Sequence, residues 1–144
     1  MKKLLFITPL LFLLSCSETV TKEEQSTVNV DGREVSTIKI GNLEVMTEDL
    51  GAMDWDEASK ACSALGDGWR LPAKDELNIL YEQKDKVCGF DNYDTTSYVS
   101  PLYATYWSST EYDDFNAWLQ NFGRGYQIAT NKIDANYVRA VRDF

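Results

Sequence analysis

Two groups of acidic and amide side chains are the first residues in the sequence that could do chemistry. Their oxygen atoms are the ligands that Ca²⁺ prefers, and close carboxylates can also act as an acid–base pair. The two groups are Asp91, Asn92 and Asp94, and Asp113, Asp114 and Asn116. The Glu-Pro-Asn, Gln-Pro-Asp and Trp-Asn-Asp triplets of calcium-dependent sugar-binding lectins are absent from the sequence. We therefore predict no cofactor, with Ca²⁺ as an open alternative and the identity of any metal unknown.

The sequence lacks histidine and the short motifs that mark several common classes of enzyme. It contains no histidine, so the commonest general base and the commonest transition-metal ligand are both missing. It also has no nucleophile elbow, no glycine-rich phosphate loop and no zinc-ligand spacing. Acidic residues in loops are usually only solvated, so the carboxylates alone do not indicate catalysis. We predict that the protein is not an enzyme.

Tyrosines and polar residues in the second half of the chain are better candidates for binding. A tyrosine ring can stack on the apolar face of a sugar or anchor a protein interface. The predicted ligand contacts are Tyr93, Tyr112, Asp113, Asp114, Arg124 and Tyr126. Arg124 is expected at the tip of a hairpin as an exposed cation. The alternative is that the tyrosines only cover the core and that Arg124 only occupies a turn.

The N-terminus reads as a targeting segment. Residues 1–3 are basic, and Leu4–Leu14 is apolar but too short for a helix that spans a bilayer. The small Ser15 precedes Cys16, and the whole stretch resembles a bacterial lipoprotein signal with its lipobox. That resemblance implies a signal peptide over residues 1–15, cleavage before Cys16, and acylation of Cys16, for example with palmitate. An ordinary secretory signal is the alternative.

The segment after Cys16 is expected to be a flexible tether over residues 16–26, because it holds too few apolar side chains to fold. Acids just after a lipidated cysteine resemble the surface-export signals of some outer-membrane lipoproteins. We therefore expect a lipid-anchored protein of the cell envelope, at the outer membrane. Whether it faces inward or outward is left open.

The chain is strongly acidic. Its formal net charge is −9, and removal of residues 1–15, which carry two lysines and no acid, makes it −11. Such a chain is repelled by phosphate backbones, so we predict no nucleic-acid partner. Cys62 and Cys88 form an even pair in an exported protein, and either a disulfide between them or two unpaired thiols fits their spacing.

Residues 27–144 are expected to form one α+β domain. Alternating apolar residues, broken at two glycine turns, predict hairpin strands over 27–46. Asp54 with Glu57 predicts the start of a helix that ends near Gly66, and a second helix is predicted over about 73–86. A long irregular region over 88–106 precedes further strands, which include the stretches "TYWSSTE", "AWLQNF", "YQIATNKI" and "NYVRAVRDF".

Four motifs in order carry a family resemblance. They are "MDWDEASKACSALGDGWRLPAKDELNILY", "YWSSTE", "AWLQNFGRG" and "YVRAVR". Over roughly residues 36–144 the chain resembles the Lcl C-terminal domain family, within the C-type-lectin-like superfamily. The fold of formylglycine-generating enzymes is similar, but their late cysteine pair has no counterpart after Cys88. The resemblance implies two helices flanking short antiparallel sheets, a long irregular loop region, and adhesion or glycan binding rather than catalysis.

Within these motifs the aromatic and arginine residues are assigned to structure. Trp69, Trp107 and Trp118 are expected in the core, and Pro72 leads into the second helix. Arg70 is expected partly buried against a carboxylate or carbonyls, and at least one of Arg139 and Arg142 is expected in an internal ion pair. Family members usually have Thr or Ser at the position of Ala73, so the helix is expected to lose a cap worth about 1 kcal/mol.

Two functions follow from the sequence. The first is a non-catalytic envelope lipoprotein, an adhesin whose lectin-like domain binds a glycan or another surface ligand. The alternative is a protein-interaction subunit of an outer-membrane assembly. A concave patch of tyrosines with polar neighbours would favour the first, and a flatter apolar patch would favour the second.

Overall fold

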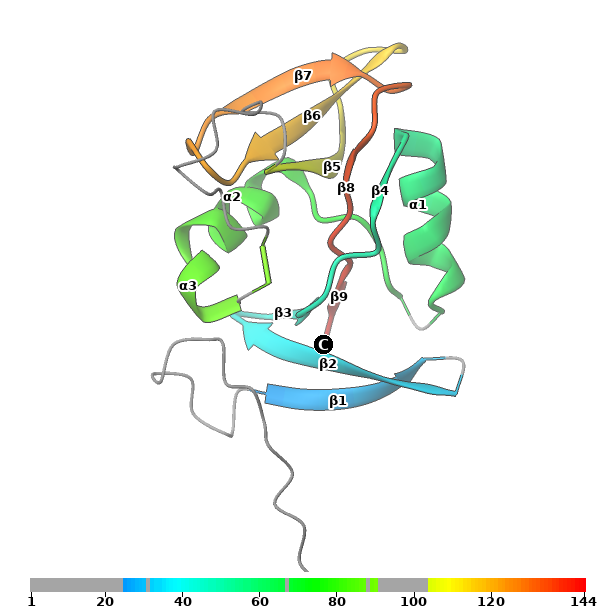
Figure 1. The fold of residues 1–144 in the computed structure, drawn as a ribbon, viewed down its shortest axis with the longest axis vertical. Coiled ribbons are helices and arrows are strands. Elements are labelled where there is room, and N and C mark those ends of the chain that lie inside the picture. Colours follow the sequence, from blue (N-terminus) through cyan, green and yellow to red (C-terminus); the bar gives the residue numbers. More distant parts are fainter. Residues whose placement is uncertain (1–24, 31, 67, 88, 91–103) are drawn as a thin grey trace, which may run out of the picture.

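The chain folds into two sheets with helices packed between and beside them (Figure 1). A computed structural model describes residues 25–30, 32–66, 68–87, 89–90 and 104–144. The predicted signal segment and most of the predicted tether lie outside these residues, as do Tyr93, Cys88 and the group Asp91, Asn92 and Asp94. None of the helices in the described part of the chain has the length and apolar character that a membrane crossing needs.

The first sheet joins the N-terminal strands to the C-terminus. Its order is β1 (Gln25–Val30), β2 (Arg33–Ile40), β3 (Leu43–Met46) and β9 (Val141–Asp143), with every neighbouring pair antiparallel. The predicted hairpin strands over 27–46 are therefore confirmed, although β1 begins two residues earlier than the predicted domain boundary. Its strands turn at Gly32 and Gly41, both of which have positive φ.

The second sheet holds the late strands. Its order is β4 (Ala52–Met53), β8 (Asn136–Tyr137), β5 (Thr105–Glu111), β6 (Asn116–Asn121) and β7 (Gln127–Asn131). The pairs are antiparallel except β5 and β8, which run parallel. The expectation of purely antiparallel sheets is therefore wrong at this pair. β8 lies on the side of β5 opposite to β6, and a single residue pair, Tyr106 and Tyr137, forms the parallel bridge.

The helices follow their sequence signals closely. In α1 (Trp55–Ala64), the Asp54 carboxylate accepts the Glu57 amide at 2.8 Å, which is the predicted cap. The chain leaves this helix through Gly66 at φ +72°. The predicted second helix is divided into α2 (Lys74–Glu82) and α3 (Lys84–Val87), because the backbone leaves the helical region at Gln83.

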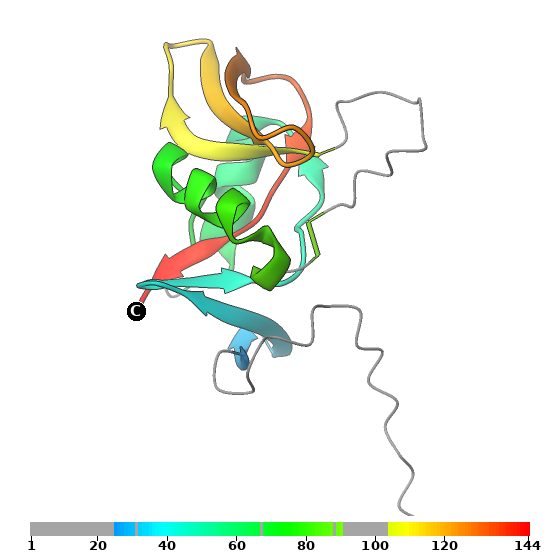
Figure 2. The ribbon, with the colours of Figure 1, turned by 90° about the vertical axis from the view of Figure 1, so that its left-hand side faces the viewer.

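Two apolar clusters fill the space between these layers. One contains Ile38, Val45, Leu77, Leu80 and Tyr106 and lies between the first sheet and α2. Figure 2 shows α2 and α3 between the two sheets. The other packs α1 against the second sheet through Ala58, Cys62, Trp69, Trp107 and Leu119. Trp69 and Trp107 are buried, as predicted.

Candidate functional site

Arg139 is a fully buried structural residue. Its Nε lies 2.6 Å from Asp49 Oδ1, and its other nitrogens donate to the carbonyls of Met46 and Gly89. The guanidinium also lies 4.2 Å above the centre of the Phe90 ring. Burial of a charge is costly unless it is paired and hydrogen-bonded, and this one is. The predicted internal ion pair is confirmed, and the guanidinium has no exposed surface for a ligand.

Arg142 forms a second ion pair of the same kind. Its Nε lies 2.7 Å from the Glu44 carboxylate, which also accepts a hydrogen bond from Thr37 at 2.7 Å. Burial acts to raise the pKa of Glu44, but the hydrogen bonds from Thr37 and Arg142 outweigh it and leave this pKa below its usual value. Glu44 is therefore held ionised in the first sheet, where it joins β3 to β9.

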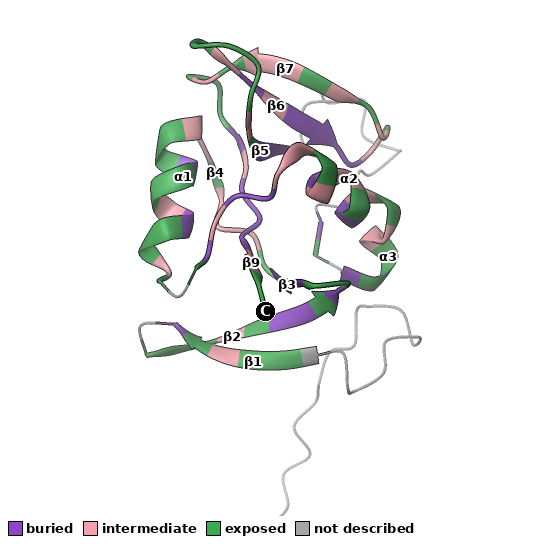
Figure 3. Cartoon of the chain, turned by 180° about the vertical axis from the view of Figure 1, so that it is seen from behind, coloured by how far each residue is buried: buried purple, intermediate pink, exposed green. Residues whose placement is uncertain are grey.

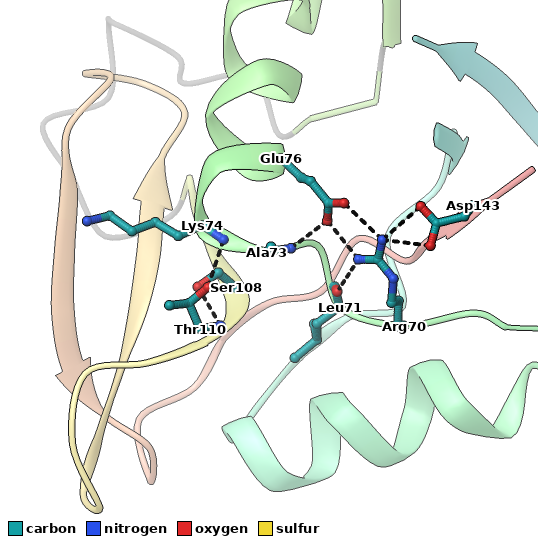
Figure 4. Close-up of polar contacts among 8 residues, drawn as sticks. All are labelled: Arg70, Leu71, Ala73, Lys74, Glu76, Ser108, Thr110 and Asp143. Atoms are coloured by element: carbon teal, nitrogen blue, oxygen red, sulfur yellow. Dashed lines mark hydrogen bonds and ion pairs between the residues drawn. The ribbon is translucent and has the colours of Figure 1, made fainter. Parts of the chain in front are cut away.

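Arg70 holds the corner that leads into α2 (Figure 4). It makes a bidentate pair with Glu76 at 2.7 and 2.9 Å and reaches Asp143 at 3.1 Å. The same Glu76 carboxylate accepts the Ala73 amide at 2.7 Å. The hydrogen bonds from Arg70 lower the pKa of Glu76. The segment around Arg70 is thus a structural corner, as the sequence indicates.

The missing cap of α2 is supplied by a neighbouring strand. Ala73 has no side-chain oxygen, but the Lys74 amide donates to Thr110 Oγ1 on β5 at 2.9 Å (Figure 4). The Ser109 amide also donates to the Pro72 carbonyl at 2.8 Å. Thr110 therefore satisfies the first amide of α2 and partly offsets the expected loss at Ala73, since a Ser or Thr cap would accept a later amide. This contact joins distant residues, so no local pattern could reveal it.

Cys62 carries a free thiol in the core, and burial raises its pKa to about 12. This corresponds to the unpaired alternative at that position. A thiol held in its neutral form by burial is a poor nucleophile. Its predicted partner Cys88 lies outside the described residues.

The structure divides the predicted ligand contacts into two places. Tyr112, Asp113 and Asp114 form the turn before β6, whereas Arg124 and Tyr126 form the turn after it. A strand of this length holds its ends roughly 17 Å apart. The two turns therefore do not form one site, and Arg124 lies at the hairpin tip as an exposed residue.

The turn before β6 carries an aromatic surface that extends onto the strand. Tyr112 is 62% exposed and meets Trp118 edge to face, with ring centroids 5.5 Å apart. Lys74, at the start of α2, places its Nζ 3.4 Å from the centre of the Trp118 ring. We call Tyr112, Trp118 and Lys74 the aromatic shelf.

The predicted core position of Trp118 is wrong. Alternation along β6 buries Ala117 and Leu119 against the α1 side and turns Trp118 to the other face of the sheet, which α2 covers. Lys74, in the first turn of α2, lies over the Trp118 ring, which is half-buried. The sequence offered no signal for Lys74, which comes from a distant helix.

Asp113 has a structural task in the same turn. Its carboxylate accepts hydrogen bonds from the backbone amides of Phe115 and Asn116. The Asn116 side-chain amide donates to both of its oxygens, and all four distances are 2.8 to 3.0 Å. These hydrogen bonds lower the pKa of Asp113, and the one from the Asn116 side chain has the largest effect. Among the described residues no cluster of three or more acidic or cysteine side chains could hold a metal ion.

These observations define an α+β domain in which Arg70, Arg139 and Arg142 serve the structure, while its late turns carry the exposed aromatic residues Tyr112, Phe115 and Tyr126. The chain belongs to the Lcl C-terminal domain family, which it matches over residues 17–142. A comparison with curated protein sequences finds no match. One solved structure that it resembles is a chain of the complex between the von Willebrand factor mutant (I546V) A1 domain and botrocetin. That likeness has a TM-score of 0.48 at 10% identity, covers 75% of this chain and 96% of the other, and carries no argument about function.

Proposed function

We propose that this protein is a non-catalytic, lipid-anchored envelope protein whose C-type-lectin-like domain binds a glycan on the aromatic shelf. The observation that carries the proposal is the exposed Tyr112 ring, 62% accessible and supported edge-on by Trp118. An aromatic ring held in this way can stack on the apolar face of a sugar without first being ordered.

Polar groups beside the shelf support recognition of hydroxyl groups. Lys74 supplies an ammonium over the Trp118 ring, and Asp113 and Asn116 lie in the same turn as Tyr112. Ligand sites commonly combine aromatic area with a few polar groups that fix orientation. A ligand that stacks on Trp118 would displace the Lys74 ammonium, which then becomes available as a hydrogen-bond donor.

A glycan array with the full chain tests this proposal, run once with Ca²⁺ and once with chelator. We expect selective binding that Tyr112→Ser abolishes. The matched control is Tyr126→Ser at the opposite end of β6, 42% exposed, which should bind as the unaltered chain does. No selective binding by the folded chain, or equal loss in both variants, would contradict the proposal. Glycan binding that depends on Ca²⁺ would show that the proposed site must include a metal ion.

The proposed anchor is tested separately. Cys16→Ser should prevent incorporation of labelled palmitate and release the protein from the membrane fraction. Labelling that persists in the variant would rule out Cys16 as the acylated residue.

A protein-interaction subunit of an outer-membrane assembly is the second candidate function. Its specific support is the pair Phe115 and Ile133, whose side chains are 73% and 81% exposed in adjacent turns. Large apolar side chains exposed together often mark an interaction site.

A further inference from the structure

We infer that the end of the second sheet docks a protein segment that carries basic side chains next to apolar ones. The surface consists of Glu111, residues 113–116 and residues 130–134, which we call the acidic tip; Tyr112, whose ring packs edge to face against Trp118, belongs to the aromatic shelf. This inference rests on the second candidate function and does not depend on glycan binding.

The two turns of the acidic tip are joined directly. The Lys132 amide donates to the Phe115 carbonyl at 2.9 Å, and Lys132 Nζ contacts both the Glu111 carboxylate and the Asp114 carbonyl. Phe115 therefore lies next to Ile133, the neighbour of Lys132 in the chain. In Figure 1 these turns lie together at the upper right, beside the start of α1. The two most exposed large apolar side chains among the described residues are thus carried on turns whose backbones are hydrogen-bonded to each other.

The acidic tip is held in shape by its own hydrogen bonds. The Asp113 carboxylate accepts the Phe115 amide at 2.9 Å, and Asn131 Oδ1 accepts the Ile133 amide at 3.2 Å. Asp134 accepts the Thr130 hydroxyl at 2.6 Å. Both apolar side chains are therefore carried on fixed backbone, so a partner would not have to order the turns when it binds.

Charge decides what kind of partner fits. The Trp55 amide donates to the Lys132 carbonyl at 2.9 Å, which brings the first turn of α1 to the acidic tip. Together these segments hold seven carboxylates: Asp54, Asp56, Glu57, Glu111, Asp113, Asp114 and Asp134. Their only lysine or arginine is Lys132, whose side chain is 17% exposed and paired with Glu111.

This charge distribution disfavours other occupants. A second copy would bring the same carboxylates against these, and an anionic lipid surface or a sulfated glycan would also be repelled. A segment with lysine or arginine beside apolar residues can pack against the exposed Phe115 and Ile133 and pair its cations with the carboxylates around them. Figure 3 shows in green that the turns at this end of the sheet are exposed.

A set of three fluorescent peptides tests the inference with the full chain. The first alternates lysine with leucine, the second alternates glutamate with leucine, and the third alternates lysine with serine. We expect the lysine–leucine peptide to bind most tightly, and its binding to weaken as salt is raised. The double variant Phe115→Ser/Ile133→Ser should weaken it roughly tenfold. Ile79→Ser/Phe144→Ser, which removes exposed apolar side chains elsewhere, is the matched control and should bind within about twofold of the unaltered chain.

The outcomes separate this inference from the proposed function. Absence of binding, equal binding of the lysine and glutamate peptides, or unchanged binding by the Phe115→Ser/Ile133→Ser variant would overturn it. Loss of binding in the control pair as well would also overturn it, because the acidic tip would then have no special part. Tyr112→Ser should abolish glycan binding and leave peptide binding in place, and the Phe115→Ser/Ile133→Ser variant should do the reverse.

Discussion

Charge is compensated around Arg139, whereas at the acidic tip most of the carboxylates have no compensating cation among the described residues. Around Arg139 a single guanidinium is buried and meets Asp49 and two backbone carbonyls, so its charge is compensated inside the fold. At the tip, carboxylates outnumber cations and most of them end in solvent. The difference indicates that the arginine motifs maintain the architecture, whereas the late turns leave charged and apolar side chains exposed to solvent.

The strongest test of this comparison is Arg139→Met. The variant removes the guanidinium that compensates the Asp49 charge and leaves the Met46 and Gly89 carbonyls without this donor. We expect a loss of about 3–5 kcal/mol in the free energy of unfolding, measured by urea denaturation. The control Arg124→Met, at an exposed tip, should change it by less than about 0.5 kcal/mol. Equal losses in the two variants would remove the distinction between structural and surface arginines.

The next largest effect concerns the hydrogen bond that Thr110 accepts at the start of α2. Thr110→Val keeps the shape of the side chain but removes the oxygen that accepts the Lys74 amide. We expect a loss of about 1 kcal/mol in the free energy of unfolding. Ala73→Ser in the same background should restore part of it, because a serine at this position can accept the amides of the first helical turn. An unchanged free energy of unfolding in Thr110→Val would mean that the hydrogen bond from the Lys74 amide does not stabilise the start of α2.

Glu76 makes the stability of the fold sensitive to acid. Its hydrogen bonds to Arg70 hold its pKa in the folded chain below the ordinary value of 4.5. Its contribution to stability is therefore present above about pH 4.5 and is lost as the pH falls through the lower, folded pKa. Urea midpoints measured from pH 6 to pH 3 should fall less steeply in Glu76→Gln than in the unaltered chain. An identical slope would show that Glu76 is not among the groups that govern acid unfolding.

The smallest expected effect is at the acidic tip itself. Phe115→Ser and Ile133→Ser should each change the free energy of unfolding by less than about 0.5 kcal/mol, because their side chains are 73% and 81% exposed. Thermal and urea unfolding of both variants measure this. A loss above 1 kcal/mol in either variant would place that residue with the structural group and weaken the case for a docking surface.

Local patterns in the sequence were sufficient for most elements of the fold. The cap at Asp54, the strand Thr105–Glu111 and the corner at Arg70 all depend on residues close together in the chain, and the structure confirms each. Trp118 was misplaced because alternation along a strand does not say how far a helix extends over each face. The cap at Thr110 was missed for a related reason, since it joins residues 36 positions apart.

The candidate site was only partly visible in the sequence. Tyr112 stood out as a tyrosine in a polar turn, but its support by Trp118 and the ammonium of Lys74 depends on the packing of α2 against β6. Phe115 and Ile133 do not stand out in the sequence, because isolated apolar residues in loops are common. Only the pairing of their two turns brings them together. The signal that could have found them is the acid beside each, since Asp114 precedes Phe115 and Asp134 follows Ile133.

The position of β8 and β9 has a consequence for the order in which the chain can fold. Both strands come from the last nine residues and pair with β4 and β3 near the beginning of the domain, and Val141 also forms a bridge with Arg70. Neither sheet is therefore complete before residues 136–143 have been synthesised. Contacts between such distant residues favour slow, all-or-none folding. A partial chain that ends before residue 136 therefore lacks the β9 edge of the first sheet and the β8 strand between β4 and β5 in the second.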